Sequence, residues 1–413
     1  MISPVIKLTE NRHMETQNLI ENLKIDVPIQ PSPIILSGSV IRILKRKVFL
    51  QLFRILNQKT HNVLKSLRII NQFKNKYKAI FGEPLLSKVS QVDSRYFYRL
   101  GSPGFPSLAS KRVHENEIAR LVTSESNYGL RTLFIAITKQ CPLNCEHCFE
   151  WDNLNKKDRL STSDIIQIVR EYQNYGTTQI MFSGGEPMMR KNDLYTILDK
   201  TEPGTDFWII TSGLGLTIEA AQLLKKHGLT GVMVSLDHHE PLRHNQFRGN
   251  QNAYKWATEA VINSNSAGLV TALSLCATKE FVHEDNFSGY MNLAKDLGIS
   301  FVQIIEPRAA GRYKGKDVML GDKELQLLDE IYLKYNSAPK FKAYPIINSL
   351  GYHQRKVGCF GGGSRFFYID TDGDAHLCPY CTGKTNNVLE KSPKEIIEKL
   401  SNKSCHVFEK SMI

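Results

Sequence analysis

Three cysteines lie close together in the stretch "CPLNCEHCF", residues 141–149. Three residues separate Cys141 from Cys145, and two residues separate Cys145 from Cys148. A structural zinc site takes four protein ligands, and a disulfide takes two cysteines. Three neighbouring thiols therefore indicate a metal site in which one coordination position is left open for another molecule.

The elements around these cysteines follow a regular order. From residue 131 to residue 306, short apolar or β-branched runs alternate with amphipathic stretches of helical length. This alternation predicts a parallel sheet with helices outside it, either open or curled into part of a barrel. Chemistry in such folds occurs in the loops after the strands, and the three cysteines follow the first strand. The predicted strands are residues 132–138, 178–183, 207–212, 231–236, 270–278 and 301–307, the last without its final residues.

The cysteine spacing, with His147 before the last cysteine, resembles the signature of the radical S-adenosylmethionine (radical SAM) superfamily. The second predicted strand leads into "FSGGEP" (182–187), which resembles the GGEP motif of that superfamily. The third and fourth strands end in "TSG" (211–213) and "SLD" (235–237), which are also similar to segments of its members. The sequence departs from the family pattern at Ser212, usually asparagine, and at His238, often glycine.

The resemblance implies an α/β fold, a partial (β/α)6 TIM-like barrel, and an enzyme with defined cofactors. Three cysteines would hold a [4Fe–4S] cluster, and S-adenosylmethionine (SAM) would chelate the open iron. The reduced cluster would cleave SAM to a 5′-deoxyadenosyl radical, which activates a substrate C–H bond. An electron donor such as flavodoxin or ferredoxin would reduce the cluster.

Further residues near the ends of the predicted strands are candidates for the site. Asp237 and Arg248 are the candidate catalytic pair, which would shape the site. Arg308 and Arg312 would contact the SAM carboxylate or a substrate anion, or form surface ion pairs. For His238, His239 and His244 we favour solvent or substrate contact over metal binding. The residues expected to contact SAM are Ser183, Gly184, Gly185, Glu186, Ser212, Ser235 and Arg308.

A second group of cysteines follows in the C-terminal part. "TDGD" (371–374) lies between two β-type arms and predicts a hairpin that brings Cys359 near Cys378. The region resembles the SPASM or twitch extension of radical SAM enzymes, which implies one auxiliary [4Fe–4S] cluster. The alternative is a structural zinc ion, and whether Cys405 is a ligand stays open. The expected ligands are Cys359, Cys378, Cys381 and Cys405, whereas Cys276 is expected in the core.

The charge of the chain is concentrated near its N-terminus. Lys and Arg outnumber Asp and Glu by 53 to 41 overall, and residues 27–82 contain eleven basic residues and no acidic one. Apolar residues recur there at helical spacing. This pattern predicts basic amphipathic helices, which either pack as a cap on the catalytic body or contact a membrane peripherally. No recognised nucleic-acid motif accompanies the charge, so nucleic acid is not an expected partner.

The expected organisation has three parts: a basic, mostly helical N-terminal region (1–125), a radical SAM core (126–310) and a small α+β Fe–S-binding extension (311–413). No apolar run approaches the length of a membrane span and the start lacks a secretory signal, so a cytoplasmic protein is expected. By resemblance, the leading substrate is a ribosomally made peptide. The alternatives are a lipid or small metabolite modified at the membrane surface, and a non-catalytic Fe–S carrier or sensor.

Overall fold

The computed structural model describes residues 33–81, 87–123, 128–359, 362–381, 383–403, 405 and 407–408. Residues 27–32 and 82 of the basic segment lie outside these ranges, as does the whole of the unit Met1–Gln30. Everything below concerns the second compact unit, Pro31–Ile413.

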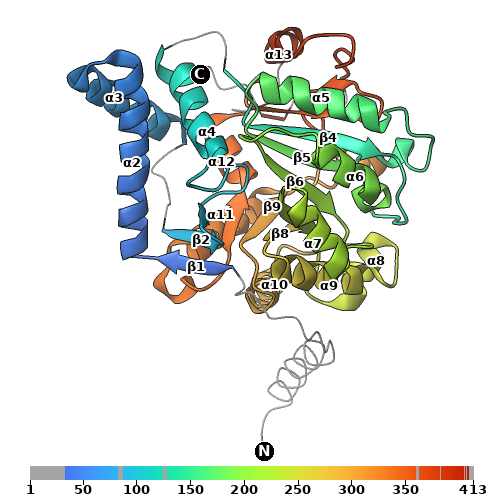
Figure 1. The fold of residues 1–413 in the computed structure, drawn as a ribbon. Coiled ribbons are helices and arrows are strands. Elements are labelled where there is room, and N and C mark those ends of the chain that lie inside the picture. Colours follow the sequence, from blue (N-terminus) through green and yellow to red (C-terminus); the bar gives the residue numbers. More distant parts are fainter. Residues whose placement is uncertain are drawn as a thin grey trace, which may run out of the picture. The chain divides into compact units, whose positions relative to one another are not determined.

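A curved sheet forms the centre of this unit (Figure 1). Its strands follow the order β10-β9-β8-β7-β6-β5-β4-β11-β12, and all neighbouring pairs are parallel except β11 with β12. The sheet stays open, because no further strand pairs with β10 or β12 among the described residues. Its strands are β4 (Thr132–Thr138), β5 (Gln179–Gly184), β6 (Asp206–Thr211), β7 (Leu229–Ser235), β8 (Val270–Cys276), β9 (Phe301–Ile305), β10 (Ile346–Ser349), β11 (Phe366–Ile369) and β12 (Ala375–His376).

The six predicted strands correspond to β4 to β9, and each begins and ends within two residues of the prediction. The predicted hairpin is also confirmed, because β11 pairs with β12 around residues 370–374. The sequence did not indicate that β10 and β11 extend the barrel sheet. β10 lies parallel to β9, and β11 lies parallel to β4, so the C-terminal part contributes strands to the barrel sheet.

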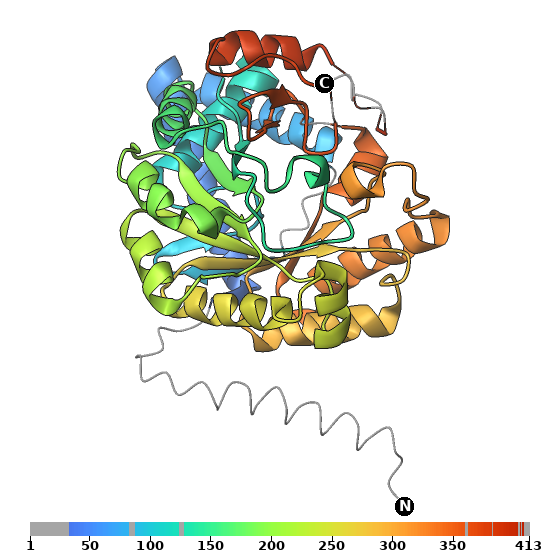
Figure 2. The same ribbon diagram turned by 90° about the vertical axis from the view of Figure 1, so that its right-hand side faces the viewer.

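Helices cover the outer face of the sheet (Figures 1 and 2). Side chains that alternate along the strands, such as Leu133, Ile135 and Ile137 of β4, pack with them in the main hydrophobic core. Ser161 caps the first of these helices, since its hydroxyl accepts from the Asp164 N–H. The helices are α5 (Thr162–Asn174), α6 (Lys191–Leu198), α7 (Ile218–Lys226), α8 (Pro241–Arg248), α9 (Ala253–Ser266), α10 (Glu284–Asp296), α11 (Asp322–Ser337), α12 (Leu350–Val357) and α13 (Pro393–Ser401).

The described part of the N-terminal region is mostly helical, as predicted, and also contains a small antiparallel sheet that was not predicted. The sheet has the order β1-β2-β3, with β1 (Ile34–Ser37), β2 (Lys88–Val92) and β3 (Arg95–Phe97). The helices are α2 (Ser39–Thr60), α3 (Val63–Phe81) and α4 (Leu108–Ile118). Phe97 and Leu100 insert into the barrel interior against Met181 and Trp208, so this region closes the end of the barrel where the strands begin.

Lys88 links β2 to α11. Its side chain is buried, and its ammonium donates to the carbonyls of Tyr335 (2.8 Å), Tyr344 (2.9 Å) and Pro345 (3.0 Å). Carbonyl groups after a helix C-terminus are favourable partners for a cation. The basic N-terminal region is thus anchored to the β9–β10 side of the barrel.

Candidate active site

The cysteine loop follows β4 at the end of the barrel where the strands finish. Cys145 is 7% exposed and packs with Leu143 and Ala253, while Cys141 and Cys148 are half-buried beside them. The loop is fixed to α8 through its backbone, because the N–H groups of Asn144 and Glu146 donate to the carbonyls of Arg248 and Phe247 (both 3.0 Å). The three thiols are therefore held on one preorganised loop.

The chemistry of these thiols fits an iron–sulfur cluster. Burial raises the pKa of both Cys141 and Cys148 to about 12, so neither thiol ionises alone at neutral pH. A bound metal supplies the positive charge that stabilises thiolates. Arg248 adds a further donor, with Nη1 3.6 Å from Cys145 Sγ. Three thiols on one loop, with an arginine aimed at one sulfur, suit a cationic cluster with one open iron.

Asp237 and Arg248 form a buried pair behind the cysteines. Arg248 donates from Nε and Nη2 to Asp237 Oδ2, each at 2.6 Å. Asp237 also accepts from the Cys276 N–H through Oδ1 (2.9 Å), and its own N–H donates to His244 Nδ1 (3.0 Å). Burial acts to raise the pKa of Asp237, but the charge of Arg248 brings it below its usual value. Asp237 therefore stays ionised and orients Arg248 toward Cys145.

The glycines of "SGGEP" let two loops meet backbone to backbone. The N–H groups of Gly185 and Glu186 donate to the carbonyls of Thr138 and Gln140, both at 2.7 Å. A Cβ on Gly185 would lie 2.3 Å from the Gln140 carbonyl oxygen, and one on Gly184 would lie 2.4 Å from that of Thr138. Only glycine allows the end of β5 to lie directly against the cysteine loop.

Glu186 links the ends of β5 and β6. Its Oε2 accepts from the Ser212 N–H (2.7 Å) and hydroxyl (2.5 Å), and its Oε1 accepts from the Thr211 hydroxyl (2.6 Å) and the Met188 N–H (3.0 Å). The carboxylate is 1% exposed, and burial raises its pKa. Both oxygens of Glu186 are thus used within the protein, and Ser212, which replaces the usual asparagine, is its main partner.

Arg308 and Arg312 follow β9 and differ in what they contact. Arg312 donates from Nη1 to the Asn144 carbonyl and side chain (both 2.6 Å), and its N–H donates to the Cys148 carbonyl (2.9 Å). Arg312 therefore braces the cysteine loop, a role that the sequence did not suggest. Arg308 lines the cavity described below and donates from Nη2 to Glu306 Oε2 at 3.2 Å.

The second group of cysteines comes from three segments. Cys378 Sγ and Cys381 Sγ lie 3.4 Å apart after β12, and the hydrogen bond between them lowers the pKa of Cys378 to about 7. Cys359 follows α12, and Cys405 follows α13. All four of these cysteines line the same cavity, which is described below.

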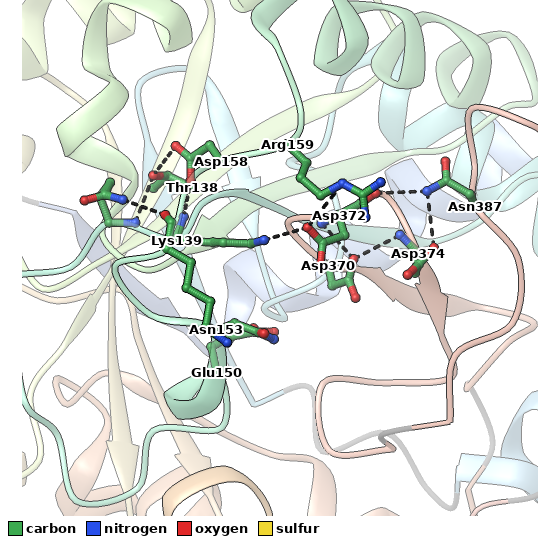
Figure 3. A network of polar contacts seen from close by, with 12 residues as sticks. Thr138, Lys139, Glu150, Asn153, Asp158, Arg159, Asp370, Asp372, Asp374 and Asn387 are labelled. Atoms are coloured by element: carbon green, nitrogen blue, oxygen red, sulfur yellow. Dashed lines mark hydrogen bonds and ion pairs between the residues drawn. The ribbon is translucent and has the colours of Figure 1, made fainter.

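A polar network joins the cysteine loop to the β11–β12 hairpin (Figure 3). Lys139, directly after β4, donates from Nζ to Asp372 in the hairpin turn at 2.6 Å. Asn387 donates to the Asp372 carbonyl (2.9 Å) and so fixes the turn from its other side. The hydroxyl of Tyr368 on β11 donates to Glu150 at 2.6 Å. This network ties the cysteine loop to the hairpin that leads to the second cysteine group, and no local sequence pattern indicated it.

One cavity of about 1520 Å³ connects these features. All seven predicted cysteine ligands line it, together with Ser183, Ser235, Asp237, Arg248 and Arg308. Its wall extends through the barrel to residues of α2, α3 and α12. The structure therefore brings the predicted SAM-contacting residues and both cysteine groups to one cavity, and adds the N-terminal helices to its wall.

The three histidines of the β7–α8 loop lie beside this site. His244 accepts from the Asp237 N–H, and His238 Nδ1 accepts from the Glu240 N–H at 2.9 Å. The ligand atoms of His238, His239 and Glu240 lie within 4.8 Å of one another. His244 thus has a positioning contact, whereas the preference against a metal at His238 and His239 stays a prediction.

Among the described residues, no helix combines the length and the apolarity that crossing a bilayer requires.

Comparison with known proteins finds similarity over the part of the chain that carries the first cysteine group. Residues 135–282 match the family model described as the radical SAM superfamily. The chain is 24% identical over 288 residues to the AdoMet-dependent heme synthase of Nitratidesulfovibrio vulgaris, covering 64% of this chain and 77% of that protein. It is 24% identical over 283 residues to the AdoMet-dependent heme synthase of Methanosarcina barkeri, covering 63% and 80%.

Solved structures share the fold. Streptococcus suis SuiB bound to precursor peptide SuiA superposes with a TM-score of 0.56 at 14% identity, covering 86% of this chain and 84% of SuiB. Native anSMEcpe with bound AdoMet superposes with a TM-score of 0.52 at 18% identity, covering 67% and 83%. At these identities the likeness concerns the fold, an α/β partial barrel of the radical SAM type.

Proposed function

We propose that this chain, in which residues 135–282 form a radical SAM domain, cleaves SAM reductively and activates a C–H bond of a substrate held in the barrel cavity. One observation carries the proposal: three thiols on one loop line a cavity together with the ends of β5, β6 and β7. In parallel α/β folds this is the edge where ligands bind. Radical SAM enzymes as a family use a [4Fe–4S] cluster and SAM.

Different residues of the site would have different roles. Cys141, Cys145 and Cys148 would be the cluster ligands, and the bound cluster would supply the electron for reductive cleavage of SAM. Asp237 and Arg248 would act as positioning residues at Cys145. Ser212 would contact SAM while its hydroxyl orients Glu186. The remaining SAM contacts would come from Ser183, Gly184, Gly185, Ser235 and Arg308.

The second cysteine group would hold an auxiliary [4Fe–4S] cluster. Its four thiols, Cys359, Cys378, Cys381 and Cys405, suit either that cluster or a tetrahedral zinc ion. The three-part organisation into residues 1–125, 126–310 and 311–413 is proposed in a functional sense, although β10 and β11 share the barrel sheet. Flavodoxin or ferredoxin would be the electron donor.

For the substrate, we propose a ribosomally made peptide. The support is that SuiB, which shares the fold, is known in complex with a precursor peptide, and anSMEcpe in complex with a peptide. The size of the cavity is compatible with a peptide segment that reaches the cysteine end.

A second candidate substrate is a lipid or small metabolite met at a membrane surface. It is favoured by α2 and α3, where Phe49, Leu50 and Leu64 are exposed among basic side chains and where residues of both helices line the cavity. Basic amphipathic helices of this kind bind anionic interfaces. Salt-sensitive co-sedimentation with anionic vesicles, lost when Phe49 and Leu50 become glutamine, would favour this candidate over the peptide.

The chemistry is tested by anaerobic reconstitution with iron and sulfide, reduction, and addition of SAM. The expected products are 5′-deoxyadenosine and methionine. Protein that carries iron and sulfide but forms no 5′-deoxyadenosine would support the third alternative, a non-catalytic Fe–S carrier or sensor. Colourless preparations without iron would refute the assignment of the cysteine loop.

A further inference from the structure

The cavity ends in a cationic pocket, at the side of the barrel where β4 and β11 begin. Arg131 and Arg365 directly precede these strands and line the cavity, as does Arg99 from the segment after β3. The acidic residues that line the described cavity are distributed unevenly. Glu150, Glu186, Asp237 and Glu306 follow strands or the cysteine loop, whereas Glu117 of α4 is the acid at the Arg131 end.

The single negative charge of Glu117 does not balance the positive charge of the arginines at this end of the cavity. Its Oε1 accepts from Arg120 Nη1 at 2.6 Å, and Arg365 donates to the same carboxylate at 3.3–3.4 Å. Arg131 is more distant, with Nη2 3.9 Å from Glu117 Oε1. One carboxylate therefore faces three guanidinium groups, and Arg99 adds a fourth. His114 adds no charge at neutral pH, because burial and Arg131 lower its pKa to about 4.

Two of these arginines retain unused donors. The Nε of Arg131 is buried without a hydrogen-bond partner in the described part of the chain. Arg99 donates from Nη1 to the Tyr77 hydroxyl at 3.0 Å and forms no ion pair within that part. Burial acts to raise the pKa of Tyr77, yet Arg99 and Arg131 bring it below its usual value, which reports a positive local potential. Within the described residues, Arg99 and Arg131 together thus carry more positive charge than Glu117 offsets, and a bound anion would stabilise it.

We propose that the pocket lined by Tyr77, Arg99 and Arg131 binds a carboxylate or phosphate group of an elongated amphipathic substrate. Arginine is suited to both groups, because its fork of N–H donors matches two of their oxygens. This inference rests on the proposed C–H activation and deepens its second candidate substrate, the lipid or small metabolite: it gives that molecule an anionic end group.

The rest of the cavity wall sets the shape of that substrate. Apolar side chains between the two ends include Phe73, Phe134, Met181 and Ile346. β4 connects the ends, since Arg131 precedes it and the cysteine loop follows it, and its seven residues span roughly 20 Å. A molecule anchored at Arg131 needs an apolar body of about that length to reach the cysteine end.

The test compares two fluorescent probes that differ in one charged group. 8-Anilinonaphthalene-1-sulfonate carries a sulfonate, and N-phenyl-1-naphthylamine has a similar aromatic body without charge. We expect Arg131→Gln and Arg99→Gln to weaken binding of the sulfonate probe about tenfold or more and to leave the neutral probe unchanged. Arg112→Gln is the matched control, because Arg112 is half-buried, donates to the Gly204 carbonyl and does not line the cavity.

Equal weakening of both probes, or no change in either, would overturn the proposal. If Arg131→Gln fails to fold, Arg99→Gln decides alone, since Arg99 is half-buried and outside the Glu117 contacts. Displacement of the sulfonate probe by decanoate, by decyl phosphate or by anionic vesicles supports the proposal and separates a carboxylate from a phosphate and a lipid source. Displacement only by an acidic peptide contradicts it. The binding assay needs no SAM cleavage, so its result is independent of whether the proposed chemistry holds.

Discussion

The two groups of cysteines differ in how the chain brings them together. The first lies on one loop that backbone hydrogen bonds, Arg248 and Arg312 hold in place. The second is assembled from segments after α12, β12 and α13, and its sulfurs have mostly weak contacts, such as Gln354 Nε2 to Cys359 Sγ at 3.9 Å. In the first group, neighbouring residues supply the thiols and distant residues hold the loop; in the second group, tertiary structure must bring the thiols together as well.

The largest expected effect comes from removing the first cysteine group, which should abolish SAM cleavage but leave the iron and sulfide of the second group. Replacing Cys141, Cys145 and Cys148 with alanine removes every ligand of the first group, so formation of 5′-deoxyadenosine should fall to background. About four iron and four sulfide ions per chain should remain, bound by the second group. Cys276→Ala, which removes a buried thiol outside both groups, is the control and should keep the full iron content. Zinc without sulfide in the triple variant would contradict the auxiliary cluster.

The next effect concerns the support of the first group. Arg248→Gln leaves Asp237 as a buried, unpaired charge and should lower the free energy of unfolding by about 3–5 kcal/mol. Arg243→Gln breaks the exposed pair with Glu240 (3.1 Å) and should cost less than about 1 kcal/mol. Urea unfolding of both variants tests the difference. Equal losses would show that the Asp237–Arg248 pair is not a structural support of the cysteine loop.

The pH dependence of stability tests a contact near the second group. Glu117 binds Arg365, and Arg365 directly precedes β11, the first strand of the hairpin that leads to Cys378. Burial acts to raise the pKa of Glu117, but Arg131, Arg365 and Arg120 lower it to about 2. The folded state then binds the proton less tightly than the unfolded state, so this contribution is present above pH 4.5 and is lost as pH falls toward 2. Its full size is about 3 kcal/mol.

Urea unfolding between pH 5 and pH 2.5 measures this contribution as the difference in slope between the protein and Glu117→Gln. The variant lacks the titrating group, so its free energy of unfolding should depend less steeply on pH. Identical slopes would mean that the arginines do not stabilise the Glu117 carboxylate.

The smallest effect compares close packing at the two groups. Gly185→Ala would place a Cβ 2.3 Å from a backbone oxygen and should cost about 1–3 kcal/mol and displace the first loop. Gly362→Ala would place one 3.1 Å from Leu377 Cγ and 3.4 Å from Cys359 Sγ, so it should cost less than about 1 kcal/mol. Melting temperatures and iron content measure both. A larger effect at Gly362 would reverse the comparison.

Much of the barrel was predictable because its strands are buried on both faces and read as continuous apolar runs. The strands β4 to β9, the Ser161 cap and the β11–β12 hairpin all follow from local patterns. The pairing of strands that are distant in sequence does not follow from local patterns. "IINS" of β10 and "FFYI" of β11 are short, and nothing in either says that it joins β9 or β4.

The candidate site likewise has a part that local sequence predicts and a part that only the structure reveals. The cysteine spacing and the glycine motif were visible because each depends on neighbouring residues. Arg312 was not identified as a brace, because its partners are backbone carbonyls about 167 positions earlier in the chain. The excess of charge around Glu117 was missed because its arginines are widely separated in sequence and fall outside the basic segment 27–82.

The open sheet has a consequence for handling the protein. No strand pairs with the outer edge of β10 in the described residues, but the Asn336 side chain bonds to the N–H (3.0 Å) and the carbonyl (2.9 Å) of Ile347 there, and β2 packs beside it. Strand edges that lose such cover promote self-association. Shortened versions that start at the barrel would uncover β10 and should form insoluble aggregates, whereas at the opposite end β12 has only two residues and presents little to a neighbouring chain.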